Sequence, residues 1–236
     1  MSLNSLISYI TNSQITTELV KRIRRDNELN IIGSSRYAKS IKLNSIAKKE
    51  NNNILLISPN EEIAFKWYGY FENIVNKNIL YYPPSENLPY ASINISKETE
   101  YTQLSVISKL IKDEKEDINI IITTERALQP HLISKKIFKD NIIKLIKGLE
   151  LDIKELTNKL VLLGYNKENL TSQEGTWSRR GEIIDIYPVN NELPVRIEFF
   201  DNIIDKIREY DPITQRTLDN IYEVEIVQVG FNLLIR

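Results

Sequence analysis

The sequence predicts an α/β protein in which a parallel sheet layered with helices precedes a smaller α+β domain with a mostly antiparallel sheet. In the first half, short apolar runs alternate with segments whose apolar residues recur at helical spacing, which is typical of parallel strands connected by helices. From about residue 141, apolar runs follow one another after short turns, which favours antiparallel pairing. With 236 residues, the chain is long enough for two domains, each with its own core.

We place the first domain at residues 1–140. Its expected strands are short apolar runs that end at a polar residue, a glycine or a proline. The strands are predicted at 29–33, 53–58, 78–82 and 117–124, and the helices at 3–10, 13–26, 37–50, 60–75 and 95–114. Ser13 suits the start of the second helix, because a serine hydroxyl accepts a hydrogen bond from a free backbone N–H there.

The second domain is expected at residues 141–224. It begins with one strand and with one helix that ends at Gly164, and closely spaced strands follow. These elements are predicted at 141–148, 151–164, 181–189, 193–201, 203–211 and 222–229. The pair Asp201-Asn202 predicts a tight hairpin turn. The last strand either belongs to this domain or returns the chain to the first one, and we expect residues 225–236 to start that return.

Composition excludes several classes of site. The formal net charge is −1, so no overall basic field attracts nucleic acid or a membrane. The chain has no cysteine and one histidine, His131, which excludes thiolate metal sites, disulfides and histidine-rich metal sites. No apolar run approaches the roughly 20 residues that span a bilayer, and the first 14 residues lack the pattern of an export signal. We therefore expect a cytoplasmic protein that holds no metal.

The stretch "NIIGSSRYAKSI" at residues 30–41 comes close to the phosphate-binding pattern G-x-x-x-x-G-K-[ST]. Gly33, Lys39 and Ser40 occupy matching positions, and Ala38 stands where the second glycine belongs. A working loop wraps its backbone N–H groups around phosphates while lysine and serine contact the phosphates and Mg²⁺. The expected strand, loop and helix suit a RecA/P-loop-like sheet, but the missing glycine makes the loop degenerate.

Three interpretations of this loop remain. It is an ordinary connection whose helix carries an outward lysine, a site where an anion rests on the helix N-terminus, or a working ATP site. The third requires an acidic segment that holds Mg²⁺ at a strand end, and "IIITTERAL" offers only Thr-Thr-Glu. We therefore expect no catalytic residue and no cofactor here, with Gly33, Lys39 and Ser40 as at most an anion site.

Two segments resemble the bacterial transcription-repair coupling factors. The segment "SENLPYASINISKETEYTQLSVISKL" at 85–110 looks like their W-E-x-L-P-Y-E motif and the helix after it, with Ser85 in place of the usual Trp. Residues 175–217 are similar, almost position for position, to G-x-F-x-x-R-G-x-x-x-D-x-F/Y-P and its continuation R-x-E/D-F-F-x-D-x-I-x-x-I-R. The excision-repair helicase subunit UvrB shares the second segment, but it keeps an intact GxGKT-type loop and inserts a tyrosine-rich hairpin.

The resemblance implies a function and partners. Coupling factors displace stalled RNA polymerase with an ATP-dependent motor on DNA and recruit the damage-recognition subunit UvrA for nucleotide excision repair. Their amino-terminal part is UvrB-like without ATPase activity, so residues 1–140 would correspond to UvrB domain 1a and residues 141–224 to the UvrA-docking domain 2. By this resemblance, RNA polymerase, DNA, ATP and Mg²⁺ concern parts of the whole protein that lie beyond these 236 residues.

The pattern and the resemblance indicate the same docking residues. Alternation along "PVRIEFFD" puts Val195, Ile197 and Phe199 on a core face, and Arg196, Glu198 and Phe200 on the opposite face. The resemblance assigns UvrA contacts to Arg180, Arg196 and Phe200. Arginine supplies bidentate hydrogen bonds to carboxylates, and an aromatic ring supplies desolvated area. We expect Arg196→Ala and Phe200→Ala to weaken UvrA binding without changing the melting temperature.

Alternatives stay open for this surface and for the whole chain. Arg180 and Arg196 could instead form structural salt bridges with Glu182, Asp185 or Glu198, while Phe200 covers a small satellite core. The chain could also be a UvrB-type ATP-binding fragment or a DNA-binding module. Two further groups look like nucleic-acid contacts: the aromatic residues Trp67, Tyr68, Tyr70 and Phe71, and the basic run "KRIRR" at 21–25. The helical spacing of the aromatic residues favours packing against the sheet. The short basic run favours a solvated helix face.

Overall fold

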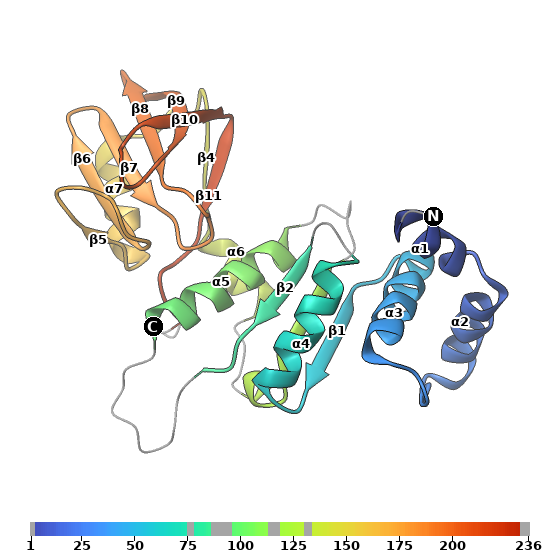
Figure 1. Cartoon of the computed structure of the whole chain (residues 1–236). Helices are drawn as coiled ribbons and strands as arrows, with labels where there is room; N and C mark the ends of the chain where they lie inside the picture. The colour runs from blue at the N-terminus through green and yellow to red at the C-terminus, as the bar shows by residue number, and fades with distance from the viewer. Residues whose placement is uncertain (1–2, 75–77, 86–95, 113–118, 130–133, 232–236) are drawn as a thin grey trace, which may run out of the picture. The chain divides into compact units, whose positions relative to one another are not determined.

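A computed structural model of the chain describes residues 3–74, 78–85, 96–112, 119–129 and 134–231 (Figure 1). The chain separates into two compact units. The first comprises Met1–Ser85 and Asp113–Pro130, and the second comprises Glu86–Lys112 and His131–Arg236. In the described part of the chain, no helix combines the length and the apolar character needed to cross a membrane.

The first unit contains the predicted parallel sheet in a smaller form. Its strands are β1 (Ile54–Ser58), β2 (Ile79–Tyr82) and β3 (Ile120–Thr124), in the order β1-β3-β2. Both outer strands run parallel to β3. Helix α4 (Glu61–Glu72) connects β1 to β2 and packs its buried Phe71 against β3. The α/β class is therefore confirmed, and a RecA-like sheet is seen only in part, as three parallel strands.

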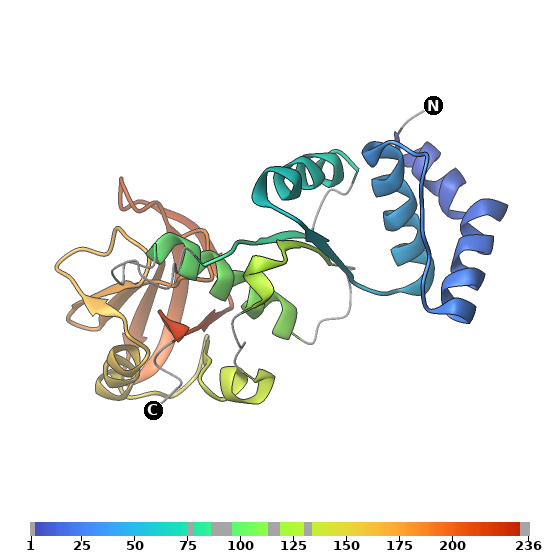
Figure 2. The same ribbon diagram turned by 90° about the horizontal axis from the view of Figure 1, so that it is seen from below.

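Three helices precede this sheet and lie side by side (Figures 1 and 2). They are α1 (Leu3–Thr11), α2 (Gln14–Asp26) and α3 (Arg36–Glu50). The predicted cap is confirmed, since the Ser13 hydroxyl accepts a hydrogen bond from the Thr16 N–H. Ile7 of α1 and Ile41 of α3 share a small core with Ile74.

The predicted strand at residues 29–33 is wrong. Residues 28–32 have no regular structure, and Ile32 is 82% exposed. A strand exists through its pairing, and among the described strands β1 pairs only with β3. Three apolar residues in five bury too little surface to hold an unpaired strand in place. The degenerate loop therefore follows an irregular segment and not a strand.

The second unit is built around a six-stranded sheet in the order β10-β9-β8-β7-β6-β5. All its neighbouring strands are antiparallel except β5 and β6. The strands are β5 (Asn166–Lys167), β6 (Thr176–Arg180), β7 (Ile183–Tyr187), β8 (Val195–Phe200), β9 (Ile203–Tyr210) and β10 (Thr217–Ile221). Helix α7 (Ile153–Leu162) packs Leu156 and Leu160 on one face of this sheet, which therefore has a buried side.

Two further strands and two helices complete the second unit. β4 (Ile143–Ile146) pairs antiparallel with β11 (Glu223–Ile226). The last predicted strand thus pairs inside this unit. Helices α5 (Lys97–Ile111) and α6 (Lys135–Asp140) share a core with Val189 and Val227. The short 3-10 helix η1 (Arg126–Leu128) belongs to the first unit. The division of the sequence at residues 140 and 224 stays a prediction.

The hairpin between β8 and β9 turns where the sequence predicts. Asp201 and Asn202 both have positive φ, 46° and 64°, as a type I′ turn requires. Phe200 and Ile203, which flank the turn, are cross-strand partners. The turn therefore sets the register of the strand that carries two of the predicted docking residues.

Candidate protein-docking site

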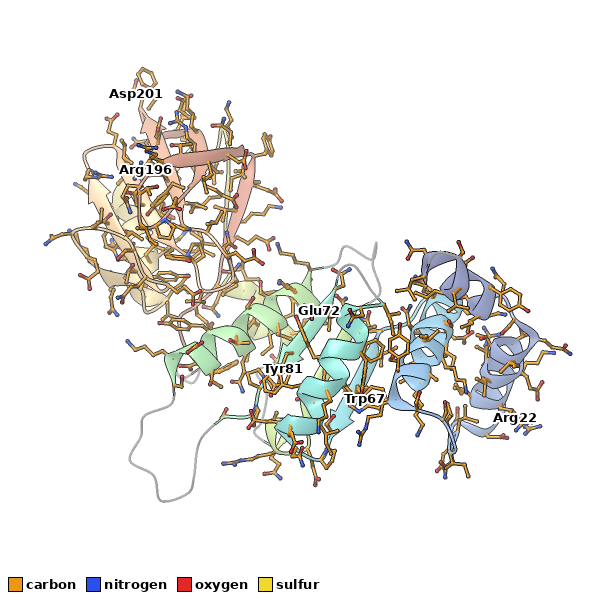
Figure 3. The ribbon with its side chains drawn as sticks, in the orientation of Figure 1. Arg22, Trp67, Glu72, Tyr81, Arg196 and Asp201 are labelled. Carbon is orange, nitrogen blue, oxygen red and sulfur yellow. The ribbon has the colours of Figure 1, made fainter. Side chains whose placement is uncertain are left out.

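The alternation predicted for β8 is confirmed. Val195, Ile197 and Phe199 are buried in the core beneath α7. Arg196, Glu198 and Phe200 lie on the opposite face, because successive side chains of a strand alternate. We call this opposite side of the six-stranded sheet the docking face. Figure 3 labels Arg196 within this sheet and Asp201 at the hairpin tip.

Asp185 on β7 lies at the centre of the docking face. It is the cross-strand partner of Arg196, and it is only 1% exposed. Arg196 donates from Nε to Oδ1 at 2.7 Å and from Nη2 to Oδ2 at 3.0 Å. Arg180, at the end of β6, donates from Nη2 to Oδ2 at 3.0 Å. One buried carboxylate thus binds both predicted docking arginines.

Neighbouring side chains fix Arg196 further. Its guanidinium carbon lies 4.6 Å from the centre of the Tyr210 ring, and its Nη2 donates to Gln215 Oε1 at 3.3 Å. The Tyr210 hydroxyl donates to the Thr171 carbonyl. The hydrogen bonds that Arg196 donates to Asp185 raise the pKa of Arg196, and burial raises the pKa of Tyr210. Arg196 is therefore a charged, oriented group with a side chain that is 15% exposed.

Phe200 differs from Arg196 in its exposure. It is 67% exposed, so it covers no satellite core. Its cross-strand partner Ile203 is also exposed, and directly opposed side chains share one face of a sheet. The hairpin end of β8 thus carries an exposed apolar pair, on the strand that also carries Arg196. Ile203 is not among the residues predicted from the sequence, although the predicted turn at Asp201-Asn202 already implied the pairing of residues 200 and 203.

The remaining charges of the docking face are mixed. Arg208 on β9 pairs with Glu198 at 3.1 Å. Arg179 points elsewhere, since its Nε donates to the Gly181 carbonyl at 2.9 Å. Arg180 remains 57% exposed despite its bond to Asp185. The same face therefore offers an exposed arginine side chain and exposed apolar side chains, a combination that suits a protein partner with carboxylates and an apolar pocket.

The phosphate-like loop has a different local geometry from a phosphate cradle. Gly33 has φ of +71°, and Ser35 is the N-cap of α3. The Ser35 hydroxyl accepts the Ala38 N–H at 3.2 Å, and the Lys39 N–H bonds the Ser35 carbonyl at 2.9 Å. Ser40 is buried and donates to the Tyr37 carbonyl at 2.7 Å. One of the N–H groups that would face an anion, that of Ala38, is thus satisfied by the Ser35 cap.

The other candidates occupy structural positions. Trp67 stacks on the buried Phe71 with ring centroids 6.2 Å apart. In the basic run, the arginines form ion pairs with nearby carboxylates. His131 and most of the segment at 85–96 lie outside the described residues. Within the described part of the chain, no three His, Cys, Asp or Glu side chains are grouped to hold a metal.

The sheet that carries the docking face lies in a part of the chain that is similar to known proteins. Residues 143–229, which include the six-stranded sheet, match the model of the UvrB interaction domain. The chain is 33% identical over 219 residues to the transcription-repair-coupling factor of Staphylococcus haemolyticus, which is 92% of the chain and 18% of that protein. It is 29% identical over 197 residues to the transcription-repair-coupling factor of Bacillus subtilis, which is 83% of the chain and 16% of that protein.

These similarities cover nearly the whole chain and only a part of each relative. The chain spans less than a fifth of the length of these curated relatives. Residues 143–229 match the model of the UvrB interaction domain, and over about nine tenths of its length the chain is similar to a segment of bacterial transcription-repair-coupling factors.

Proposed function

We propose that this chain is a non-catalytic docking module that recruits UvrA in transcription-coupled nucleotide excision repair. The observation that carries the proposal is the docking face: Phe200 is exposed on the same face of β8 as Arg196, and Arg180 is exposed at the end of β6, within the residues that match the UvrB interaction domain. Buried aromatic and arginine anchors supply most of the binding energy at protein interfaces. Phe200 gains burial only when a partner covers it.

The charges of the face define the partner's complementary surface. The Arg180 side chain is 57% exposed, and a guanidinium recognises a carboxylate through paired N–H donors. Phe200 and Ile203 require an apolar pocket close to that carboxylate. We therefore expect UvrA to place acidic residues around an apolar depression where it meets β8 and β9.

The geometry of the phosphate-like loop supports a module without nucleotide chemistry. Ser40 directs its hydroxyl to a backbone carbonyl of its own helix, whereas a Mg²⁺ ligand in such a loop faces the phosphates. We propose that the chain needs no cofactor and acts in the cytoplasm. ATP, Mg²⁺, DNA and RNA polymerase are assigned in this proposal to other parts of the whole coupling factor.

Calorimetric titration of purified UvrA with the 236-residue chain tests the proposal. Phe200→Ala and Arg180→Ala should each weaken binding by about 1 kcal/mol or more, which is roughly fivefold in Kd. Tyr9→Ala is the matched aromatic control, because Tyr9 on α1 is 68% exposed, as Phe200 is at 67%. Arg22→Ala is the matched arginine control, with a side chain 54% exposed and an ion pair to Glu18. Unchanged affinity in both docking variants would sink the proposal.

A further inference from the structure

We infer that Asp185 is a positioning residue of the docking face, which holds Arg180 and Arg196 in the orientations that the partner meets. The inference rests on the proposed function, since it concerns the same surface. Asp185 is too buried to touch a partner. It therefore acts through the two arginines.

The hydrogen bonds around Asp185 come from two different strands. Oδ1 accepts one bond from Arg196, and Oδ2 accepts one from Arg196 and one from Arg180. Arg196 lies directly opposite on β8, whereas Arg180 comes from the end of β6 on the other side of β7. Asp185 thus brings together two cations that would otherwise repel each other.

The two arginines retain different donors for a partner. The hydrogen bonds recorded among the described residues engage Nε and Nη2 of Arg196, with Asp185 and Gln215, and leave Nη1. The ring of Tyr210 supports the plane of that guanidinium. Among the described residues, the side-chain hydrogen bond of Arg180 engages Nη2 with Asp185, and the arginine side chain is 57% exposed. Arg180 is thus the main intermolecular donor, and Arg196 adds one oriented nitrogen.

A buried charge cluster of this kind is weak evidence for stability, because well-packed apolar residues often replace it without loss. Its clear effect is geometric. A guanidinium that is fixed before binding loses less side-chain entropy on association than one that is free to rotate. Asp185 therefore pre-organises the face, and its removal should weaken binding even where the fold survives.

The test is Asp185→Asn in the 236-residue chain, titrated against purified UvrA and checked by thermal melting. The amide keeps the shape of the carboxylate and removes its charge, and we expect Kd to rise at least tenfold. Glu155→Gln is the control, because it breaks the Glu155–Lys159 ion pair on α7 at the buried side of the sheet. Its Kd should stay within twofold of the parent chain.

A double-variant comparison separates positioning from a general structural role. In an Arg180→Ala/Arg196→Gln background, Asp185→Asn should change Kd less than twofold, because the groups through which it acts are gone. An equal loss in that background and in the parent chain would overturn the inference. The inference would also be overturned if Asp185→Asn alone kept a Kd within twofold of the parent chain while Arg180→Ala weakened binding. That result would leave the proposed function intact.

If Asp185→Asn alone does not fold, the test starts from the Arg196→Gln variant. In that variant the ion pair with two hydrogen bonds between Arg196 and Asp185 is already absent. Adding Asp185→Asn to it should raise Kd at least threefold further through Arg180, and an unchanged Kd would overturn the inference. If Arg180→Ala, Arg196→Gln and Phe200→Ala all bind UvrA as tightly as the parent chain, the proposed function itself fails.

Discussion

Arg196→Ala should destabilise the second unit, although the alternation along β8 alone suggests a surface substitution. The arginine side chain is 15% exposed and donates two hydrogen bonds to Asp185, which is 1% exposed. Removing one partner of a buried ion pair typically costs about 3–5 kcal/mol. Asp185 keeps its bond from Arg180, which lowers the expected loss to about 2–3 kcal/mol of unfolding free energy. The structure thus replaces the expectation of an unchanged melting temperature.

Phe200→Ala provides the contrast on the same strand. Phe200 is exposed, and substitutions of exposed side chains usually change stability by no more than about 0.5 kcal/mol. Arg196→Ala and Phe200→Ala should therefore separate clearly in stability, while both weaken UvrA binding. For this reason Phe200→Ala and Arg180→Ala are better reporters of docking than Arg196→Ala.

Urea unfolding followed by tryptophan fluorescence measures this difference. The chain has two tryptophans, Trp67 in the first unit and Trp177 in the core beneath α7. In a Trp67→Phe background, Trp177 alone reports on the second unit. A shift in the unfolding midpoint at unchanged slope gives the loss in free energy. A loss below about 0.5 kcal/mol for Arg196→Ala would refute the structural importance that we assign to its pair with Asp185.

Two other predictions concern the loop and the core. Millimolar ATP with Mg²⁺ should leave the melting temperature unchanged, because the hydroxyls of Ser35 and Ser40 already form hydrogen bonds within α3. A ligand at 100 times its Kd would instead stabilise the fold by about 2.7 kcal/mol. A rise in melting temperature of that size would contradict this prediction. Gly175→Ala should destabilise the second unit by about 2 kcal/mol or more in urea unfolding, because Gly175 has φ of +74° and a Cβ there would lie 2.7 Å from the Tyr101 hydroxyl. An unchanged midpoint would show that Tyr101 can move away.

Local patterns in the sequence predicted the frame of the docking face. The alternation along β8 and the Asp201-Asn202 turn depend on residues close in the chain, so they can be found without a structure. They placed Arg196 and Phe200 on one face and fixed the hairpin register. The resemblance added Arg180, whose strand β6 was not predicted as a separate strand.

Contacts between distant segments were not predictable in the same way. Asp185 was only one of three candidate partners for the arginines, because the register between β7 and β8 decides which carboxylate lies opposite Arg196. The predicted strand at 29–33 failed for the same reason, since pairing with another strand decides whether a short apolar run becomes one. The burial of Arg196 likewise depends on Tyr210 and Gln215 from later segments.

Calorimetric titration of UvrA with the parent chain and with Phe200→Ala is the most direct test of the central claim. We predict a saturable heat signal for the parent chain and for the Tyr9→Ala control. The Kd of Phe200→Ala should be at least about fivefold higher, which corresponds to about 1 kcal/mol. The absence of binding by the parent chain, or an equal Kd for the parent chain and Phe200→Ala, would contradict the claim that this face docks UvrA.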